Sequence, residues 1–285
     1  MSNISLQEIV CCLGQPVAGN PTQYMMEQAF AAAGLDWRYL TLEVAPANLS
    51  AALAGLRAMG FRGANLAWPH KQAAVPLLDE LSESARLIQS VNCVHHRDGR
   101  LLGENTEGQG FLHALMPIGS PAGRHCEILG AGSVARAIAV ELGLAGAASL
   151  RIVNRSAERG QELVNLLNSS PFAGRCPAVY QPWQGPHGCD PDVQLVVNAT
   201  TVGRNGLDEI VDVDLDTLAP HMVVADVNLN SDTTQWLRSA ADRGCTTLDG
   251  LGMLVQQSAI CFRLWTGSAP NTAVMREALE EFLGF

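Results

Sequence analysis

The 285-residue chain is predicted to fold as an α/β protein with two domains, because strand and helix patterns alternate along it twice. The first alternation runs from residue 9 to about residue 94. The second begins with the apolar strand that ends in Gly130-Ala131-Gly132 and continues into a helix. Alternation of this kind indicates mainly parallel sheets with helices on their faces, and 285 residues are enough for about two domains.

The elements expected in the first alternation follow from apolar periodicity and from the turn residues between them. They are strands at 9–13, 37–44 and 63–66, helices at 22–33 and 49–59, a hairpin with its tip at Asp98-Gly99, a glycine-bounded polar turn at 103–108, and a helix at 109–115. Asn20 is expected to cap the first helix, with Pro21 at its first position and Gln23 as the capping-box partner.

The glycine turn of the second alternation predicts a dinucleotide-binding site. Gly130 permits the tight turn, Gly132 lets the backbone approach a pyrophosphate, and Ala135 packs the new helix on the sheet. The turn residues Ala131, Ser133 and Val134 complete this predicted site. Free N–H groups and the positive end of the helix dipole favour a bound anion there.

The next strand ends in residues that favour NADP over NAD. An NAD-binding unit has an acidic residue at this place, whereas this chain has Asn154-Arg155, followed by Ser156 and Arg159. An arginine can hydrogen-bond a 2′-phosphate through two N–H groups, and a carboxylate would repel it. NADP is therefore the predicted cofactor.

Composition narrows the class of protein. The net charge of −10 argues against a nucleic-acid partner or an anionic membrane surface. No apolar run reaches about 18 residues, and the polar N-terminus does not resemble a signal peptide. The eight cysteines show no metal-ligand spacing, so no metal is predicted and a reduced, cytoplasmic setting is expected.

Lys71 is the first candidate for catalysis. It follows a predicted strand end and Pro69, where a helix begins, and a lysine desolvated in a cleft can act as an acid or a base. Taken alone, it is more often a solvated residue at a helix start. Asn198 and Thr200 also follow a strand, at the edge where open α/β sheets bind ligands.

In combination, these residues resemble the shikimate dehydrogenase family, which couples NADP to oxidation of one ring hydroxyl of shikimate. Five stretches carry the resemblance in order: G-x-N-V-T-x-P-x-K is similar to residues 63–71, G-A-V-N-T to 89–93, G-D-N-T-D-G to 103–108, N-A-T-x-x-G to 198–203, and D-G-x-x-M-L-x-x-Q to 249–257.

The resemblance implies roles for individual residues. Lys71 would exchange the hydroxyl proton, and Glu107 would orient the lysine and the hydroxyl. The implied substrate-binding positions are Asn20, Thr22, Asn65, Ala67, Asn92, Leu229 and Gln257, and Val227 and Gly250 would lie beside the nicotinamide. A carboxylate near a lysine raises the lysine pKa and burial lowers it, so such a pair can be tuned toward the working pH.

Four departures from the family lie at substrate positions. Asn20-Pro21-Thr22 stands where the family has S-x-S, whose hydroxyls grip the carboxylate, and Ala67 replaces a threonine. Glu107 replaces an aspartate, and Leu229 replaces a tyrosine. A shift of about 1 Å in a catalytic group can cost about a hundredfold in rate. The departures bear on the substrate more than on the reaction class.

The expected organisation is a catalytic, substrate-binding domain of residues 1–105, completed by 246–285, and a Rossmann NADP-binding domain of residues 106–245. The expected function is NADP-dependent interconversion of shikimate and 3-dehydroshikimate, which the resemblance connects to the chorismate pathway and aromatic amino acid biosynthesis. The alternatives are an NADP-binding regulator or sensor without turnover, and a dehydrogenase for quinate or another small hydroxy acid. A homodimer is left open.

Overall fold

The computed structural model describes residues 6–203, 209–229 and 233–284. The chain divides into two compact units, which are described separately below. The first unit comprises Met1–Thr106 and Gln257–Phe285, and the second comprises Glu107–Gln256. Among the described residues, we find no helix with the length and apolar character needed to cross a bilayer.

The first unit is built on a six-stranded sheet with the order β2-β1-β3-β5-β6-β4. Its strands are β1 (Glu8–Gly14), β2 (Trp37–Glu43), β3 (Gly63–Leu66), β4 (Glu80–Leu81), β5 (Cys93–Arg97) and β6 (Arg100–Glu104). The pairs β1–β2, β1–β3 and β4–β6 are parallel, and β3–β5 and β5–β6 are antiparallel. The predicted hairpin at Asp98-Gly99 is confirmed, because both residues adopt positive φ angles between β5 and β6.

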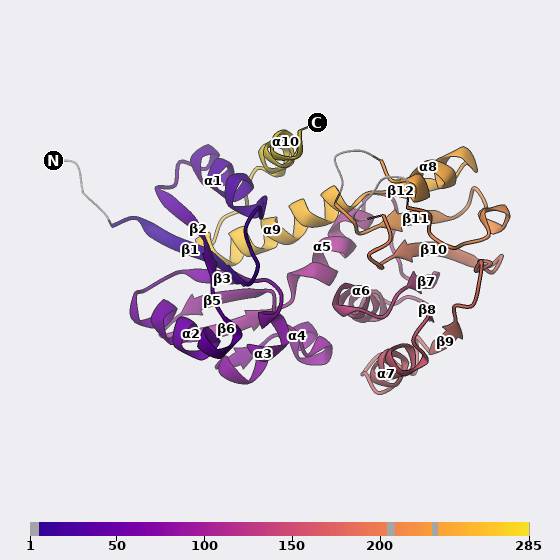
Figure 1. The fold of residues 1–285 in the computed structure, drawn as a ribbon, viewed down its shortest axis with the longest axis horizontal. Helices are drawn as coiled ribbons and strands as arrows, with labels where there is room; N and C mark the ends of the chain where they lie inside the picture. Colours follow the sequence, from indigo (N-terminus) through magenta and orange to yellow (C-terminus); the bar gives the residue numbers. More distant parts are fainter. Residues whose placement is uncertain (1–5, 204–208, 230–232, 285) are drawn as a thin grey trace. The chain divides into compact units, whose positions relative to one another are not determined.

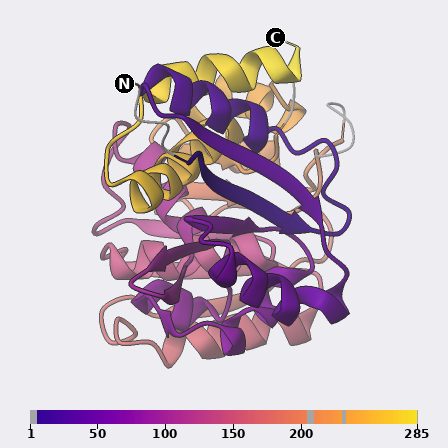
Figure 2. The same ribbon diagram turned by 90° about the vertical axis from the view of Figure 1, so that its left-hand side faces the viewer.

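Helices cover this sheet. They are α1 (Thr22–Ala32), α2 (Leu49–Ala58), α3 (His70–Ala73), α4 (Glu83–Ile88) and α10 (Thr272–Leu283). Helices α1 and α10 lie side by side although they come from opposite ends of the chain (Figure 2). Buried apolar side chains of β1, α2 and β3, such as Leu13, Leu53 and Leu66, form one core beneath the sheet.

The second unit has a six-stranded, fully parallel sheet with the order β12-β11-β10-β7-β8-β9 (Figure 1). Its strands are β7 (His125–Leu129), β8 (Ser149–Asn154), β9 (Ala178–Pro182), β10 (Val193–Asn198), β11 (Val223–Asp226) and β12 (Thr246–Leu248). The strand order reverses between β7 and β10, and such a switch point is where doubly wound sheets bind ligands.

The helices associated with the second sheet are α5 (Thr106–Leu115), α6 (Ser133–Leu144), α7 (Ala157–Asn168), α8 (Gln235–Asp242) and the start of α9 (Gly250–Thr266). Trp236 and Leu237 of α8 pack with Leu129, Val153 and Val196 of the central strands in one core. Helix α6 presents Ala135 and Ile138, which are fully buried. The fold class predicted from sequence is therefore confirmed.

Three details differ from the sequence predictions. Helix α5 begins at Thr106, so Glu107 lies in its first turn and not in a polar loop. Gly108 serves packing, because a Cβ there would approach the Ala137 carbonyl oxygen to 2.3 Å. Residues 246–248 form β12 in the second sheet, so they do not complete the first domain. Helix α1 begins at Thr22, with Pro21 as its N-cap residue and without the expected capping box.

Candidate active site

The glycine turn after β7 has the geometry of a phosphate-binding turn. Gly130 adopts φ +111°, and a Cβ there would lie 3.0 Å from the Ala199 carbonyl oxygen. At Gly132, an added Cβ would meet no atom within 4 Å, so the space in front of the backbone is open here. Gly132 is also the N-cap of α6 and makes no side-chain capping bond. The first turn of α6 thus offers N–H groups that suit a diphosphate.

The residues after β8 fit a 2′-phosphate. Asn154 is buried and donates to the Ser156 carbonyl oxygen at 2.8 Å, which fixes the start of the turn. The Ser156 hydroxyl accepts from the Arg159 backbone N–H at 3.3 Å as the N-cap of α7. Arg155 and Arg159 are both exposed, and neither is ion-paired with a residue that the structure describes. Two guanidinium groups are therefore available to a phosphate.

A hydrogen-bond network shapes the loops after β10 and β11. The Asn198 side chain is fully buried, accepts from the N–H and hydroxyl of Thr200 and donates to the Asp226 carboxylate at 3.2 Å. Asp226 also accepts from the Asn228 amide at 2.9 Å and from the Thr234 hydroxyl at 2.9 Å. Burial raises the pKa of Asp226, while these donors oppose that rise. Asn198 and Thr200 were predicted from sequence as site residues, whereas Asp226 and Thr234 were not.

Gly250 begins α9 against the loop that follows β11. A Cβ at Gly250 would lie 2.5 Å from the Asn228 carbonyl oxygen and 2.8 Å from that of Val227. Only glycine allows this approach. Val227 and Leu229 are half-buried in the same loop. The structure therefore brings together Val227 and Gly250, the two residues predicted to flank the nicotinamide.

The first unit contains a buried network of neutral polar groups. The Asn65 side chain accepts from the Tyr39 hydroxyl at 2.8 Å and donates to the Asn92 carbonyl oxygen at 3.1 Å and to the Cys261 thiol at 3.3 Å. Asn92 donates to the Thr106 hydroxyl at 3.0 Å and accepts from its backbone N–H at 2.7 Å. Because donors from Cys93, Thr106 and Asn65 outweigh burial, the pKa of Cys261 is lowered.

Asn65 and Asn92, both predicted from sequence, are thus joined in one network with three residues that sequence analysis missed, namely Tyr39, Thr106 and Cys261. The signal that could have found Thr106 is its place in the polar turn at 103–108, which the family resemblance had already singled out. No pattern pointed to Tyr39 or Cys261, because each lies in a stretch that reads as ordinary core. Their partners come from distant parts of the chain.

Asn20 and Lys71 both lie near Cys12 at the end of β1. The Asn20 amide is engaged at both ends, because its oxygen accepts from the Thr22 N–H at 2.9 Å and its nitrogen donates to the Cys12 thiol at 3.3 Å. Burial raises the pKa of Cys12 to about 11, and hydrogen bonds from Asn20 and Tyr39 and the charge of Lys71 oppose that rise. Lys71 itself is half-buried in α3.

The remaining predicted residues differ in exposure. Thr22 and Glu107 are buried, with 8% and 7% of their surfaces exposed. Ala67 and Gln257 are half-buried. The Ala67 methyl packs close to β1, because a Cβ at Gly14 would lie 2.8 Å from it. A larger side chain at 67 must therefore point away from Gly14.

Comparison with known proteins identifies the family of this chain. The family description "Shikimate dehydrogenase substrate binding domain" matches residues 12–94, and "Shikimate 5'-dehydrogenase C-terminal domain" matches residues 250–280. The shikimate dehydrogenase (NADP(+)) of Moorella thermoacetica is 41% identical over 280 residues, which cover 97% of this chain and 94% of that protein. The chain belongs to the shikimate dehydrogenase family.

Two solved structures extend the comparison. The ligand-free 5-ketofructose reductase of Gluconobacter sp. strain CHM43 is 42% identical, has a TM-score of 0.94 and aligns over 97% of this chain and 99% of its own. The shikimate 5-dehydrogenase of Listeria monocytogenes, solved with shikimate and NAD, is 31% identical, has a TM-score of 0.90 and aligns over 98% and 99%. The chain is therefore similar to proteins named for different substrates.

Proposed function

We propose that this protein is an NADP-dependent oxidoreductase that interconverts shikimate and 3-dehydroshikimate. The observation that carries the proposal is 41% identity to an NADP-dependent shikimate dehydrogenase over nearly the whole chain. The glycine turn and the exposed Arg155 and Arg159 supply what NADP needs, and Lys71 supplies an acid–base group. Such a reaction belongs to the route toward chorismate and the aromatic amino acids.

The residues implied in proton exchange and substrate binding have the following proposed roles. Lys71 takes the proton of the hydroxyl during oxidation and returns it during reduction. Glu107 orients this exchange as a buried carboxylate in the first turn of α5. Asn92 and Gln257 bind further ring hydroxyls. Asn65 acts as a positioning residue, because both of its amide N–H groups already donate to protein acceptors.

The residues of the second unit have proposed roles in binding. The turn from Gly130 to Val134 binds the diphosphate through backbone N–H groups at the start of α6. Arg155 and Arg159 bind the 2′-phosphate, with Asn154 and Ser156 fixing their loop. When bound, NADP accepts or supplies the hydride.

Three further residues of the second unit have proposed positioning roles toward the nicotinamide. Asn198 and Thr200 set the loop after β10, since each side chain bonds to the other. Gly250 lets Val227 and the start of α9 lie in contact. The wider proposal is a reduced, cytoplasmic setting with a small-molecule partner, supported by eight buried free thiols, and a homodimer stays a prediction.

A specific observation favours a second candidate, reduction of a keto sugar such as 5-ketofructose. The structure named for that activity aligns with a TM-score of 0.94, compared with 0.90 for the Listeria shikimate dehydrogenase. A keto sugar has no carboxylate. At the implied carboxylate-binding positions, the Asn20 amide is engaged at both ends and Thr22 is buried, while Ala67 and Leu229 offer no hydroxyl.

The deciding experiment compares substrates with purified protein. Shikimate is oxidised with NADP or with NAD, and 3-dehydroshikimate and 5-ketofructose are reduced with NADPH. The proposal expects turnover of shikimate with NADP and much slower turnover with NAD. A higher kcat/KM for 5-ketofructose would select the second candidate. If the protein binds NADP but turns over none of these substrates, both enzymatic candidates are contradicted. The remaining alternative is then an NADP-binding regulator or sensor.

A variant sharpens the choice between the two substrates. Asn20→Ser combined with Thr22→Ser and Ala67→Thr restores the hydroxyls of the family pattern. If this chain works on a keto sugar, the triple variant should gain activity on shikimate and lose activity on 5-ketofructose. If shikimate is already its substrate, the variant should change kcat/KM for shikimate only slightly. Unchanged affinity for NADP is the control.

A further inference from the structure

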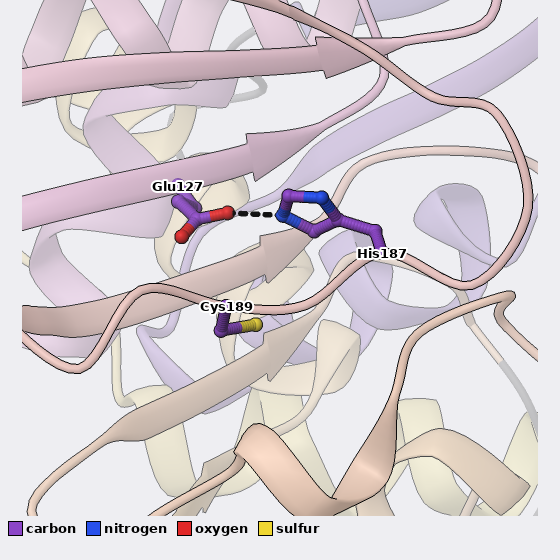
Figure 3. A group of neighbouring side chains, drawn as sticks. All are labelled: Glu127, His187 and Cys189. Carbon is purple, nitrogen blue, oxygen red and sulfur yellow. Dashed lines mark hydrogen bonds and ion pairs between the residues drawn. The ribbon is translucent and has the colours of Figure 1, made fainter.

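Three buried side chains of the second unit lie together away from the glycine turn. They are Glu127 in β7, and His187 and Cys189 in the segment between β9 and β10 (Figure 3). One carboxylate oxygen, one imidazole nitrogen and the thiol sulfur all lie within 4.8 Å of one another. The Glu127 Oε2 and His187 Nε2 atoms are 2.5 Å apart. Among the described residues, this is the one group of three potential metal ligands.

Glu127 is a buried carboxylate that shares its arginine with a second acid. Glu127 has no exposed surface, and its Oε1 lies 3.6 Å from Arg151 and accepts from the Asp190 backbone N–H at 3.2 Å. Arg151 also forms an ion pair with the half-exposed Asp190 carboxylate. A buried carboxylate is costly unless it is paired, so the side chains beside Oε2 matter for its stability.

We propose that Glu127, His187 and Cys189 form a binding site for a divalent transition-metal ion of the zinc type. The set offers one oxygen, one nitrogen and one sulfur ligand, a combination that zinc accepts. Binding releases the proton of the Cys189 thiol to solvent as the sulfur–metal bond forms. The positive charge of the metal would lie directly beside the buried Glu127 carboxylate.

The distances require only small movements. With metal bonds of about 2.0 Å to oxygen and nitrogen and about 2.3 Å to sulfur, tetrahedral ligand atoms lie about 3.3 to 3.6 Å apart. His187 must therefore withdraw from Glu127 by under about 1 Å, and the sulfur must approach by at most about 1.3 Å. Glu127 is fixed in a central strand, and the His187 backbone is bridged to Val213, so the adjustment falls on the imidazole and thiol side chains.

Access and neighbours fit the proposal. A hollow of about 210 Å³ lies beside the cluster and is lined by His187, Arg151 and Asp190. A fourth ligand, such as water, would approach the metal from this side. Arg151 contacts Oε1 of Glu127, so that Oε2 of the same carboxylate faces His187.

Cobalt(II) tests the proposal, because a sulfur ligand gives Co²⁺ a charge-transfer band in the near ultraviolet. The full chain, freed of metal by a chelator and kept reduced, is titrated with Co²⁺ and then with Zn²⁺. The expected result is a band that saturates at one equivalent and disappears when Zn²⁺ is added. Absence of the band at several equivalents would overturn the proposal.

Matched variants locate the sulfur ligand. Cys189→Ser should lose the band, whereas Cys245→Ser should keep it, because Cys245 is a buried thiol of the same core that bonds to the Ala219 carbonyl oxygen. A band that survives in Cys189→Ser would overturn the proposal. Zinc-edge X-ray absorption on the unaltered protein needs no variant. It should show one sulfur at about 2.3 Å, and a shell of only nitrogen and oxygen would contradict the site.

Discussion

In the first unit, the buried polar groups around Asn65 and Asn92 are amides, hydroxyls and thiols, whereas the second unit buries the carboxylate of Glu127 beside Arg151. A neutral network loses about 1 kcal/mol for each hydrogen bond removed. A buried charge that loses its partner costs several times more. The two units should therefore respond very differently to single substitutions.

The same contrast extends to the proposed ligands. The first unit has no Lys or Arg before Arg38, and Lys71 is the cation beside its neutral network. The second unit presents Arg155 and Arg159 to solvent at the edge of its sheet. Cofactor binding should depend on charge, and substrate binding should depend on neutral donors and acceptors. Four predictions, from the largest expected effect to the smallest, test this division.

The largest effect is expected for Arg151→Met. Removing the guanidinium leaves Glu127 buried without its cation, which should lower the free energy of unfolding by about 3 kcal/mol. Denaturant unfolding measures the loss. The control is Arg57→Ala, which removes an exposed ion pair with Asp79 and should cost under about 1 kcal/mol. Equal losses of unfolding free energy in the two variants would contradict the proposed difference between the buried and the exposed ion pair.

Glu107→Gln should lower kcat by about 100-fold, since it removes the charge of the carboxylate proposed to orient proton exchange. Glu107 is buried in the first turn of α5, and glutamine preserves its size. Steady-state kinetics with saturating NADP measure the change. Glu107→Asp, which keeps the charge, should retain more activity than Glu107→Gln. The opposite order would show that shape matters at this position and charge does not.

Arg155→Ala should lower kcat/KM for NADP roughly 10- to 150-fold, the range for one charge-assisted hydrogen bond, and should leave kcat/KM for NAD unchanged. The variant should therefore narrow the preference for NADP. Arg97→Ala, which removes an exposed arginine next to the hairpin tip, is the control. If both coenzymes lose activity equally, Arg155 does not bind the 2′-phosphate.

The smallest effect is a pH dependence from Glu104, which is half-buried and pairs across the sheet with Cys93. Burial raises the pKa of Glu104, with a hydrogen bond from Ser82 opposing it. A raised carboxyl pKa means that folding disfavours the charged form. The contribution of Glu104 to the free energy of unfolding is therefore fully present at pH values below its pKa in the unfolded chain. It is lost as pH rises through its pKa in the folded protein.

Glu104→Gln removes that penalty. Its stability relative to the unaltered protein should therefore improve as pH rises above about 4, the ordinary range of a glutamate pKa. Unfolding curves at several pH values measure the difference. Glu277→Gln, at an exposed residue of α10, is the matched control and should show a flat difference. An advantage of Glu104→Gln that shrinks with rising pH would reverse the sign and contradict the account.

Local patterns in the sequence were sufficient for most of the fold. The strand at Gly63–Leu66 and the helix at Thr22 lie where apolar periodicity put them, because both are set by residues close in the chain. Residues 103–108 were less well predicted. Their two glycines indicated a turn, but Gly108 is required for close packing of α5 on Ala137. Tertiary packing decides this position, and no local pattern reports it.

The sites divide in the same way. The glycine turn and Arg155 could be proposed from sequence because each lies in a short local pattern directly after a strand. The cluster of Glu127 and His187 was not found, because its members lie 60 positions apart and meet only through the loop before β10. Tyr39 and Cys261 escaped notice for a similar reason, since their partners are supplied by other strands and helices.

The central claim is NADP-dependent hydride transfer that depends on Lys71. The most direct measurement is deuterium transfer from C4-deuterated NADPH to 3-dehydroshikimate, followed by mass spectrometry of the product, for the unaltered protein and for Lys71→Met. The account predicts one deuterium per product molecule for the unaltered protein. Lys71→Met should bind NADPH equally well and form product at least about 100-fold more slowly. Transfer by Lys71→Met at the unaltered rate would contradict the account.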